Sequence, residues 1–203
     1  MVLDSQTKGS LIVRALIEKV LLTKDPRILV SMVPLFQPRT HKKGEVLLNQ
    51  GEVWSKAFFI ERGIIRMHII GREGKDFNKS FYAEGTMVFP ITQEMEEQPS
   101  PFNISALEHS VVWHAHISDL RTGLESQGLW EPLRAELLGR LLSQKLQREY
   151  DLLTLDGKAR YQKFCENKPE LAARLPLAHL ASYLGLTDVS LSRIRRQLKK
   201  VQE

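Results

Sequence analysis

The stretch that most restricts the fold is Leu175–Lys200, which reads LPLAHLASYLGLTDVSLSRIRRQLKK. Pro176 suits the first turn of a helix, where its missing N–H is not needed. Ala181 is small where a second helix must cross closely, and Gly185, four residues later, can adopt a left-handed turn. An aliphatic residue, Leu191, follows six positions further on. This spacing predicts a helix-turn-helix, the motif that places its second helix in the major groove of DNA.

The second helix of this motif has two different faces. Leu191, Ile194 and Leu198 recur at spacings of three and four and form the inner face, and Thr187 is suited to cap the N-terminus. The opposite face is polar and cationic, as a helix that enters the major groove requires. The residues predicted to bind DNA are Thr187, Asp188, Val189, Ser190, Ser192, Arg193, Arg196 and Lys200.

Positive charge is concentrated in the same part of the chain. Residues 157–203 contain ten Lys and Arg against four acidic residues, a net charge of +6, whereas the other 156 residues carry −1. A basic end on a near-neutral body indicates that this end meets a polyanion. Overall, 42% hydrophobic and 26% charged residues are typical of a globular protein. The single cysteine, Cys165, excludes a disulfide framework and a Cys-rich metal site, and it fits the reducing cytoplasm.

Short β-rich runs separated by glycine-bearing turns occupy the region from Thr40 to Ile117. The predicted strands are Val46–Leu48, Ala57–Ile60, Ile64–Ile70, Phe77–Tyr82, Met87–Phe89, Phe102–Leu107 and Val111–Ile117. Strands at such short intervals predict an antiparallel barrel or sandwich. The acidic stretch Thr92–Pro101 interrupts them as a helical insert or loop, and residues 10–36 are expected to be helical.

A long helix is predicted over residues 118–155, and its apolar residues form two stripes. These stripes are Trp130, Leu133, Leu137 and Leu141 on one side, and Leu138, Leu142, Leu146, Tyr150 and Leu153 on the other. Two stripes need two surfaces to bury them. The first can pack on the barrel and the second on the same helix of another chain, although a helix buried on both sides within one chain is the alternative. The expected domains are therefore a barrel with N-terminal helices (10–117), a dimerisation helix (118–155) and a helix-turn-helix domain (157–203).

Taken together, these segments resemble the Crp/Fnr family. The segment KKGEVLLNQGEVWSKAFFIERGIIRMHIIGREGKDF resembles the cyclic nucleotide-binding β-barrel, with Gly44, Gly51, Gly63 and Gly74 at the turns of the family. LASYLGLTDVSLSRIRRQL resembles its recognition unit. The resemblance implies an α+β fold with an antiparallel jelly-roll barrel, a long dimerisation helix and a C-terminal helix-turn-helix domain.

The functional implications of the resemblance are specific. It implies a cytoplasmic homodimeric transcription regulator, not an enzyme, that binds a two-fold-symmetric operator in double-stranded DNA. RNA polymerase and a small-molecule effector are further implied partners. The base-reading positions of the family fall on Asp188, Val189 and Arg193, and Val189 departs from the acidic residue often found there.

A second departure concerns the ligand. Nucleotide-binding members of the family use a Gly-Glu pair for the ribose and an arginine for the cyclic phosphate, but here Gly85 precedes Thr86, and Ser100–Phe102 replaces the arginine. Residues 80–120 contain no Lys or Arg and six acidic residues. Because a buried phosphate without a cation costs several kcal/mol, we expect an effector other than cyclic AMP. The residues expected to line its pocket are Gly85, Thr86, Met87, Val88, Phe102 and Asn103, and no cofactor or metal is predicted.

Two other functions remain open from the sequence alone. His114 and His116 lie two apart on a predicted strand and so share a face, as two metal ligands of a cupin-like barrel enzyme would. The barrel is alternatively a protein-interaction module with vestigial DNA binding, although the basic face of the last helix argues against that hypothesis.

Overall fold

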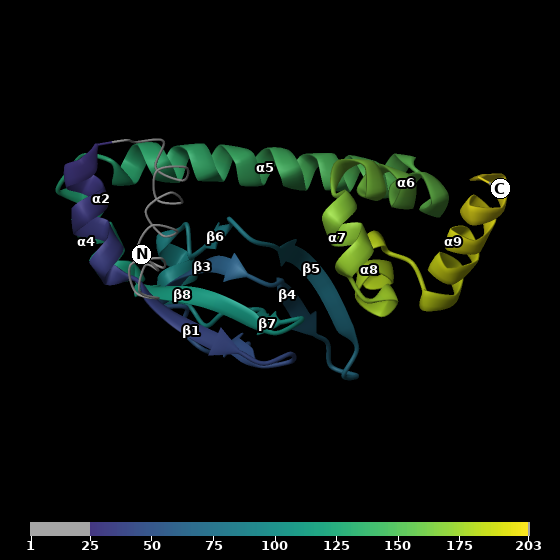
Figure 1. Ribbon diagram of the computed structural model, residues 1–203, viewed down its shortest axis with the longest axis horizontal. Helices are drawn as coiled ribbons and strands as arrows, with labels where there is room; N and C mark the ends of the chain where they lie inside the picture. The colour runs from purple at the N-terminus through teal and green to yellow at the C-terminus, as the bar shows by residue number, and fades with distance from the viewer. Residues whose placement is uncertain (1–24, 203) are drawn as a thin grey trace, which may run out of the picture. The chain divides into compact units, whose positions relative to one another are not determined.

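The computed structural model describes residues 25–202, and Figure 1 labels their helices and strands. Residues 10–24 of the predicted N-terminal helical segment lie outside this described part. The elements in chain order are α2 (Pro26–Met32), the 3-10 helix η1 (Val33–Leu35), β1 (Gln37–His41), β2 (Val46–Leu48), β3 (Lys56–Arg62), β4 (Ile65–Ile70), β5 (Asp76–Tyr82), β6 (Met87–Val88), α3 (Gln93–Glu97), β7 (Asn103–Ala106), β8 (Ser110–His116), α4 (Ile117–Glu125), α5 (Trp130–Thr154), α6 (Gly157–Asn167), α7 (Pro169–Arg174), α8 (Leu177–Leu184) and α9 (Asp188–Gln202).

Within the described residues the strands form two four-stranded sheets, in the orders β1-β8-β3-β6 and β2-β7-β4-β5. Each of the seven predicted strands is present, and the antiparallel barrel is confirmed. Strand β1 was not predicted, because Gln37–Thr40 lacks the alternation of apolar residues that marks a strand. It pairs antiparallel with β8, and Gln37 lies opposite His114 in that register.

Sheet β1-β8-β3-β6 buries side chains on both faces. On one face, Ala57 and Phe59 of β3 belong to a cluster completed by residues of α2, α4 and α5, including Met32 and Leu120. Alternate residues point the other way. Among them, Phe58 stacks on Trp54 with ring centroids 6.5 Å apart. The helices therefore cover one face of this sheet and leave the other to the barrel interior.

The turn between β3 and β4 depends on Gly63. Its φ of +99° lies in a region that residues with a side chain rarely adopt. A Cβ at this position would lie only 2.2 Å from the Ser110 Oγ atom. The Gly63 N–H donates to the Glu84 carboxylate at 2.8 Å, so the turn also anchors the chain before β6.

The prediction of one continuous helix over residues 118–155 is wrong. The segment contains α4 and α5, separated by a turn at residues 126–129. Gly128 adopts a φ of +66°, and the Leu129 N–H donates to the Leu124 carbonyl at 2.9 Å, which closes the end of α4. Apolar periodicity continues across this turn, so the sequence alone did not reveal the interruption.

The chain divides into two compact units. One contains the residues up to Arg66 together with Phe81–Gly139, and the other contains Met67–Ser80 together with the residues from Arg140 onward. Helix α5 thus contributes its first part to one unit and its second part to the other. In the second unit the Asp156 side chain caps α6 by accepting the Ala159 N–H at 2.8 Å.

Candidate nucleic-acid interface

Helices α8 and α9 form the predicted helix-turn-helix. Leu180, Ala181 and Leu184 of α8 are buried, as is Leu191 on the inner face of α9. Gly185 ends α8 in the left-handed conformation with a φ of +67°. Gly185 thus has the turn conformation that its spacing predicted, and the small, buried side chain of Ala181 leaves room for a second helix to cross closely.

Thr187 caps the N-terminus of α9. Its Oγ1 atom accepts the Ser190 N–H at 3.2 Å and donates to the Ser190 Oγ atom at 2.8 Å. The predicted cap is therefore confirmed. The hydroxyl groups of both residues, which the sequence also assigned to DNA, hold the start of the helix in this structure.

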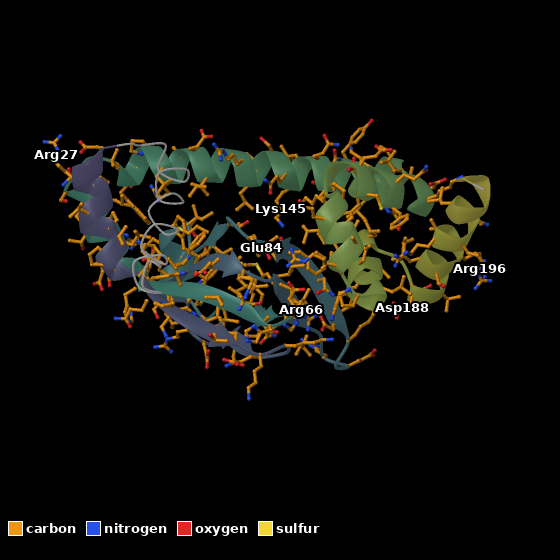
Figure 2. The ribbon with its side chains drawn as sticks, in the orientation of Figure 1. Arg27, Arg66, Glu84, Lys145, Asp188 and Arg196 are labelled. Carbon is orange, nitrogen blue, oxygen red and sulfur yellow. The ribbon has the colours of Figure 1, made fainter. Side chains whose placement is uncertain are left out.

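Five of the predicted DNA-binding residues lie together around one groove. The groove has a volume of about 410 Å³ and is lined by Leu177, Asp188, Val189, Ser192, Arg193 and Arg196. Figure 2 shows Arg196 projecting outward from α9. Val189 is 69% exposed, and both arginines are exposed as well. The remaining predicted residue, Lys200, lies on α9, but its side chain is outside the described part of the chain.

The two arginines of the groove carry uncompensated charge. Among residues 25–202, neither Arg193 nor Arg196 has a carboxylate within ion-pair distance. An exposed guanidinium presents five N–H donors in a planar fork that fits the edge of guanine or a phosphate. The groove therefore combines shape, positive charge and free donors on one helix face.

The residues expected to line the effector pocket make backbone hydrogen bonds and packing contacts within the barrel. The Gly85 N–H donates to the Ile60 carbonyl at 2.9 Å, and the Thr86 carbonyl accepts the Ile60 N–H at 3.0 Å. Met87 packs against the helical cluster, whereas the next residue, Val88, is buried and alternates to the other face of β6. The backbone bonds of Gly85 and Thr86 join the turn before β6 to β3.

Asn103, the first residue of β7, and Phe102 just before it are both buried. Phe102 meets Trp54 edge-on with ring centroids 5.9 Å apart. The Asn103 Oδ1 atom accepts the Gln50 N–H at 2.9 Å. Both side chains are therefore engaged in packing or hydrogen bonding within the barrel.

His114 has a partner that the sequence did not suggest. It is buried, and its Nε2 atom lies 3.0 Å from the Nε2 atom of His41, whereas His116 at the end of β8 is exposed. His41 and His114 are 73 residues apart, and their contact depends on the pairing of β1 with β8. In the register of these strands His114 lies opposite Gln37 and His41 opposite Ser110, so the two rings meet through their side chains and not as directly opposed residues.

The barrel is similar in sequence to a known protein family. Residues 38–127 match the family model described as the cyclic nucleotide-binding domain. This part of the chain therefore has the fold of a cyclic nucleotide-binding domain. This domain begins in β1 and ends just after α4, so α5 and the helix-turn-helix lie beyond it.

Solved structures that cover most of the chain contain this domain within a larger fold. The c-di-GMP responsive global regulator CLP of Xanthomonas campestris is 13% identical, with 88% of this chain and 93% of that chain covered and a TM-score of 0.65. The catabolite activator protein of Thermus thermophilus is 19% identical, with 90% and 88% covered and a TM-score of 0.55. A Eubacterium rectale protein assigned to the Crp/Fnr family is 13% identical, with 86% and 83% covered and a TM-score of 0.66.

The chain therefore has the fold of Crp/Fnr transcriptional regulators, with a cyclic nucleotide-binding domain followed by a helix-turn-helix. No curated protein sequence matches it. In the described part of the chain, no helix is both long and apolar enough to cross a membrane.

The cyclic nucleotide-binding domain has an unusual charge balance around the position where the family resemblance places an arginine. Ser100, one of the three residues Ser100–Phe102 that replace this arginine, is buried and donates its hydroxyl to the Phe102 carbonyl at 2.8 Å. Glu84, just before Gly85, accepts the Gly63 N–H, and Glu96 of α3 forms an ion pair with Arg121 of α4. These contacts hold the loop residues in place without supplying a cation from residues 80–120.

Proposed function

We propose that this protein is a sequence-specific DNA-binding transcription regulator that acts as a homodimer in the cytoplasm. The observation that carries the proposal is the groove on α9, where Arg193 and Arg196 are exposed and without an ion-pair partner among the described residues. The concentration of positive charge in residues 157–203 supports a polyanionic partner. The helix-turn-helix supplies the element that enters the major groove.

Dimerisation is supported by the outer stripe of α5, which we define as Leu142, Leu146, Tyr150 and Leu153. These side chains are 61%, 56%, 60% and 80% exposed, respectively. Their spacings of four, four and three residues place them on one side of the helix. A continuous apolar stripe of this kind costs free energy in water, about 25 cal/mol per Å² of apolar surface. Packing against the same stripe of a second chain removes that cost and aligns two recognition helices on a symmetric operator.

We propose that the effector is a molecule other than cyclic AMP. A cyclic phosphate needs a cation when it is buried, and residues 80–120 offer six acidic residues and no Lys or Arg. Titration calorimetry with cyclic AMP and cyclic GMP should therefore detect no binding at micromolar nucleotide. A micromolar dissociation constant would contradict this part of the proposal and would mean that residues outside 80–120 supply the countercharge.

The central experiment selects DNA from a pool of random duplexes with the purified full-length chain. We expect an enriched inverted repeat, bound more tightly than unrelated duplex by a factor of at least 1,000. The double substitution Arg193→Ala, Arg196→Ala should abolish this preference. The matched control, Lys42→Ala, Lys43→Ala, removes the same charge from an exposed barrel turn and should leave the preference intact. Equal loss in both double variants, or no enriched sequence, would reject the proposed function.

A further inference from the structure

A cavity of about 290 Å³ lies within the second compact unit, away from the groove on α9. Three helices wall it: α5 through residues 144–152, α6 through residues 160–167, and α8 through Tyr183 and Leu184. Its volume is near the lower end of the range for small-molecule sites in proteins.

The wall of this cavity is strongly cationic. Four basic side chains, Arg148, Arg160, Lys163 and Lys168, line it against one carboxylate, Asp151. Lys163 already neutralises that carboxylate, because its Nζ atom lies 2.8 Å from the Asp151 Oδ1 atom. The Lys163 ammonium also lowers the pKa of Asp151, which keeps the carboxylate ionised. Three positive charges therefore remain without a counterion in the described wall of the cavity.

The two arginines are held by contacts that use only part of their donor groups. One terminal nitrogen of Arg148 donates to the Tyr183 carbonyl at 2.9 Å, and its guanidinium lies 4.8 Å from the centre of the Tyr183 ring. The Nη1 atom of Arg160 donates to the Leu155 carbonyl at 2.8 Å. The Nε atoms of both arginines are buried and have no hydrogen-bond partner among the described residues. Such N–H groups are costly to leave unsatisfied. The terminal N–H groups of the two guanidinium groups are the donors that an anionic oxygen in the cavity would engage.

The rest of the cavity wall is apolar. It is lined by Leu152, Phe164 and Leu184 beside Tyr183. The ring centroids of Phe164 and Tyr183 lie 5.6 Å apart. A ligand that places its anionic group on the arginines would lay a carbon body against this surface. An inorganic ion would satisfy the charge but leave the apolar surface uncovered.

The cavity lies on the side of α5 opposite the outer stripe. At about 100° per residue, the cavity-lining Gln144 and Asp151 point roughly 180° away from Leu142 and Leu153. A dimer formed through the outer stripe would therefore leave the cavity open. We propose that this cavity binds a small organic phosphate, with the phosphate on Arg148, Arg160 and Lys168 and the carbon body on Leu152, Phe164 and Leu184.

The test uses the full-length chain and three probes: phenyl phosphate, inorganic phosphate and phenol. Calorimetry should show phenyl phosphate binding with a dissociation constant below 1 mM, at least tenfold tighter than inorganic phosphate, and no detectable phenol binding. Lys168→Gln and Arg148→Gln should each weaken phenyl phosphate binding at least tenfold. Lys168→Gln removes no described side-chain hydrogen bond, so a folding defect in Arg148→Gln would not spoil the test.

The matched control is Lys158→Gln, which removes the same charge from an exposed position of α6 that does not line the cavity. This variant should bind phenyl phosphate as the wild type does. Equal weakening in Lys158→Gln and Lys168→Gln, equal affinity for inorganic and phenyl phosphate, or no binding at all would each overturn the inference.

A DNA phosphate is the competing occupant. In that case phenyl phosphate would release no heat, and Lys168→Gln would lower the salt dependence of DNA binding, which would also overturn the inference. The inference and the proposed function fail separately. If the protein binds phenyl phosphate but selects no DNA sequence, the proposed phosphate site is supported and the proposed function as a transcription regulator is rejected.

Discussion

His41 and His114 face each other inside the barrel, with their Nε2 atoms 3.0 Å apart. The Nδ1 atom of His41 lies 2.7 Å from the Glu45 carboxylate, and the Nδ1 atom of His114 has no hydrogen-bond partner among the described residues. The Nδ1 atom of His41 is placed to donate to the Glu45 carboxylate, and one of the two facing Nε2 atoms donates to the other. A further proton on His114 would have no acceptor in its described surroundings.

This pair should make the barrel sensitive to acid. Burial, together with the positive charges of His41, Arg39 and Lys56, lowers the pKa of His114 to about 3. A histidine in the unfolded chain has a pKa near 6.5. Between that pH and about 3, His114 therefore binds a proton in the unfolded chain but not in the folded chain. The free energy of unfolding should therefore fall as the pH drops from about 6.5 towards 3, by about 2 kcal/mol at pH 5 from this group alone. Urea unfolding at pH 7.5 and pH 5 measures the loss.

The contribution of His114 is isolated by substitution. In His114→Gln the free energy of unfolding should differ between pH 7.5 and pH 5 by about 2 kcal/mol less than in the wild type. His116→Gln, which changes an exposed histidine on the same strand, should leave this difference unchanged. An identical pH dependence in wild type and His114→Gln would show that the pair does not govern acid stability.

A charge in the outer stripe should separate the proposed dimer. Leu146→Glu places a carboxylate among apolar side chains that would be buried between two chains, at a cost of several kcal/mol. Light scattering at micromolar concentration should give twice the chain mass of 23.3 kDa for the wild type and the single mass for the variant. Gln144→Glu adds the same charge on the opposite side of α5 and should remain dimeric. A wild-type monomer at this concentration would refute the interface.

Two substitutions on α9 should separate base reading from phosphate holding. Arg193→Ala should weaken binding by about 1–3 kcal/mol per half-site and relax base preference at one symmetric position, because an arginine near the helix start can bond both acceptors of guanine. Lys200→Ala should weaken binding to all sequences alike and reduce the salt slope by roughly one unit per lost contact. Binding measured against base-substituted operators at several salt concentrations distinguishes the two effects. If Arg193→Ala kept the base preference unchanged, Arg193 would not be the base-contacting residue, and Arg196 would become the candidate for that contact.

Gly63 should tolerate no side chain. In Gly63→Ala the new Cβ would meet both the side chain and the backbone of Ser110 at less than 3 Å, and the backbone would keep a positive φ. We expect a loss of roughly 3 kcal/mol or more in the free energy of unfolding. Gly74→Ala is the matched control, because Gly74 also has a positive φ but nothing lies within 4 Å of its Cβ position. Its cost should stay near 1–2 kcal/mol, the backbone penalty alone. Similar losses in both variants would show that the contact with Ser110 is not decisive.

The sequence predicted most of the fold because its signals are local. Glycine-bearing turns mark the strands, and the spacing of Ala181, Gly185 and Leu191 marks the helix crossing. The break between α4 and α5 was missed because a glycine within an apolar periodicity does not by itself end a helix. Strand β1 was missed because an edge strand does not need an apolar face to pair with its neighbour.

The sites were predictable only where one element supplies them. The groove of α9 follows from the faces of a single helix, so its residues could be named in advance. The His41–His114 pair joins the side chains of two strands that are 73 residues apart in the sequence, and the cationic cavity collects residues from three helices. Arg148, Arg160 and Lys168 each resemble an ordinary solvated charge along the sequence, and only tertiary packing brings them together.

Helix α5 also limits how this chain can change in length. Leu142 and Leu153 of the outer stripe are 11 residues apart, close to three full turns, so they point in nearly the same direction. A single residue inserted after Leu146 would rotate the later part of the stripe by about 100° relative to its earlier part and break the stripe. An insertion of seven residues would shift the phase by only about 20°. Tolerance to insertions at this point should therefore rise and fall with the helical repeat, and natural length variation here should come in near-whole turns.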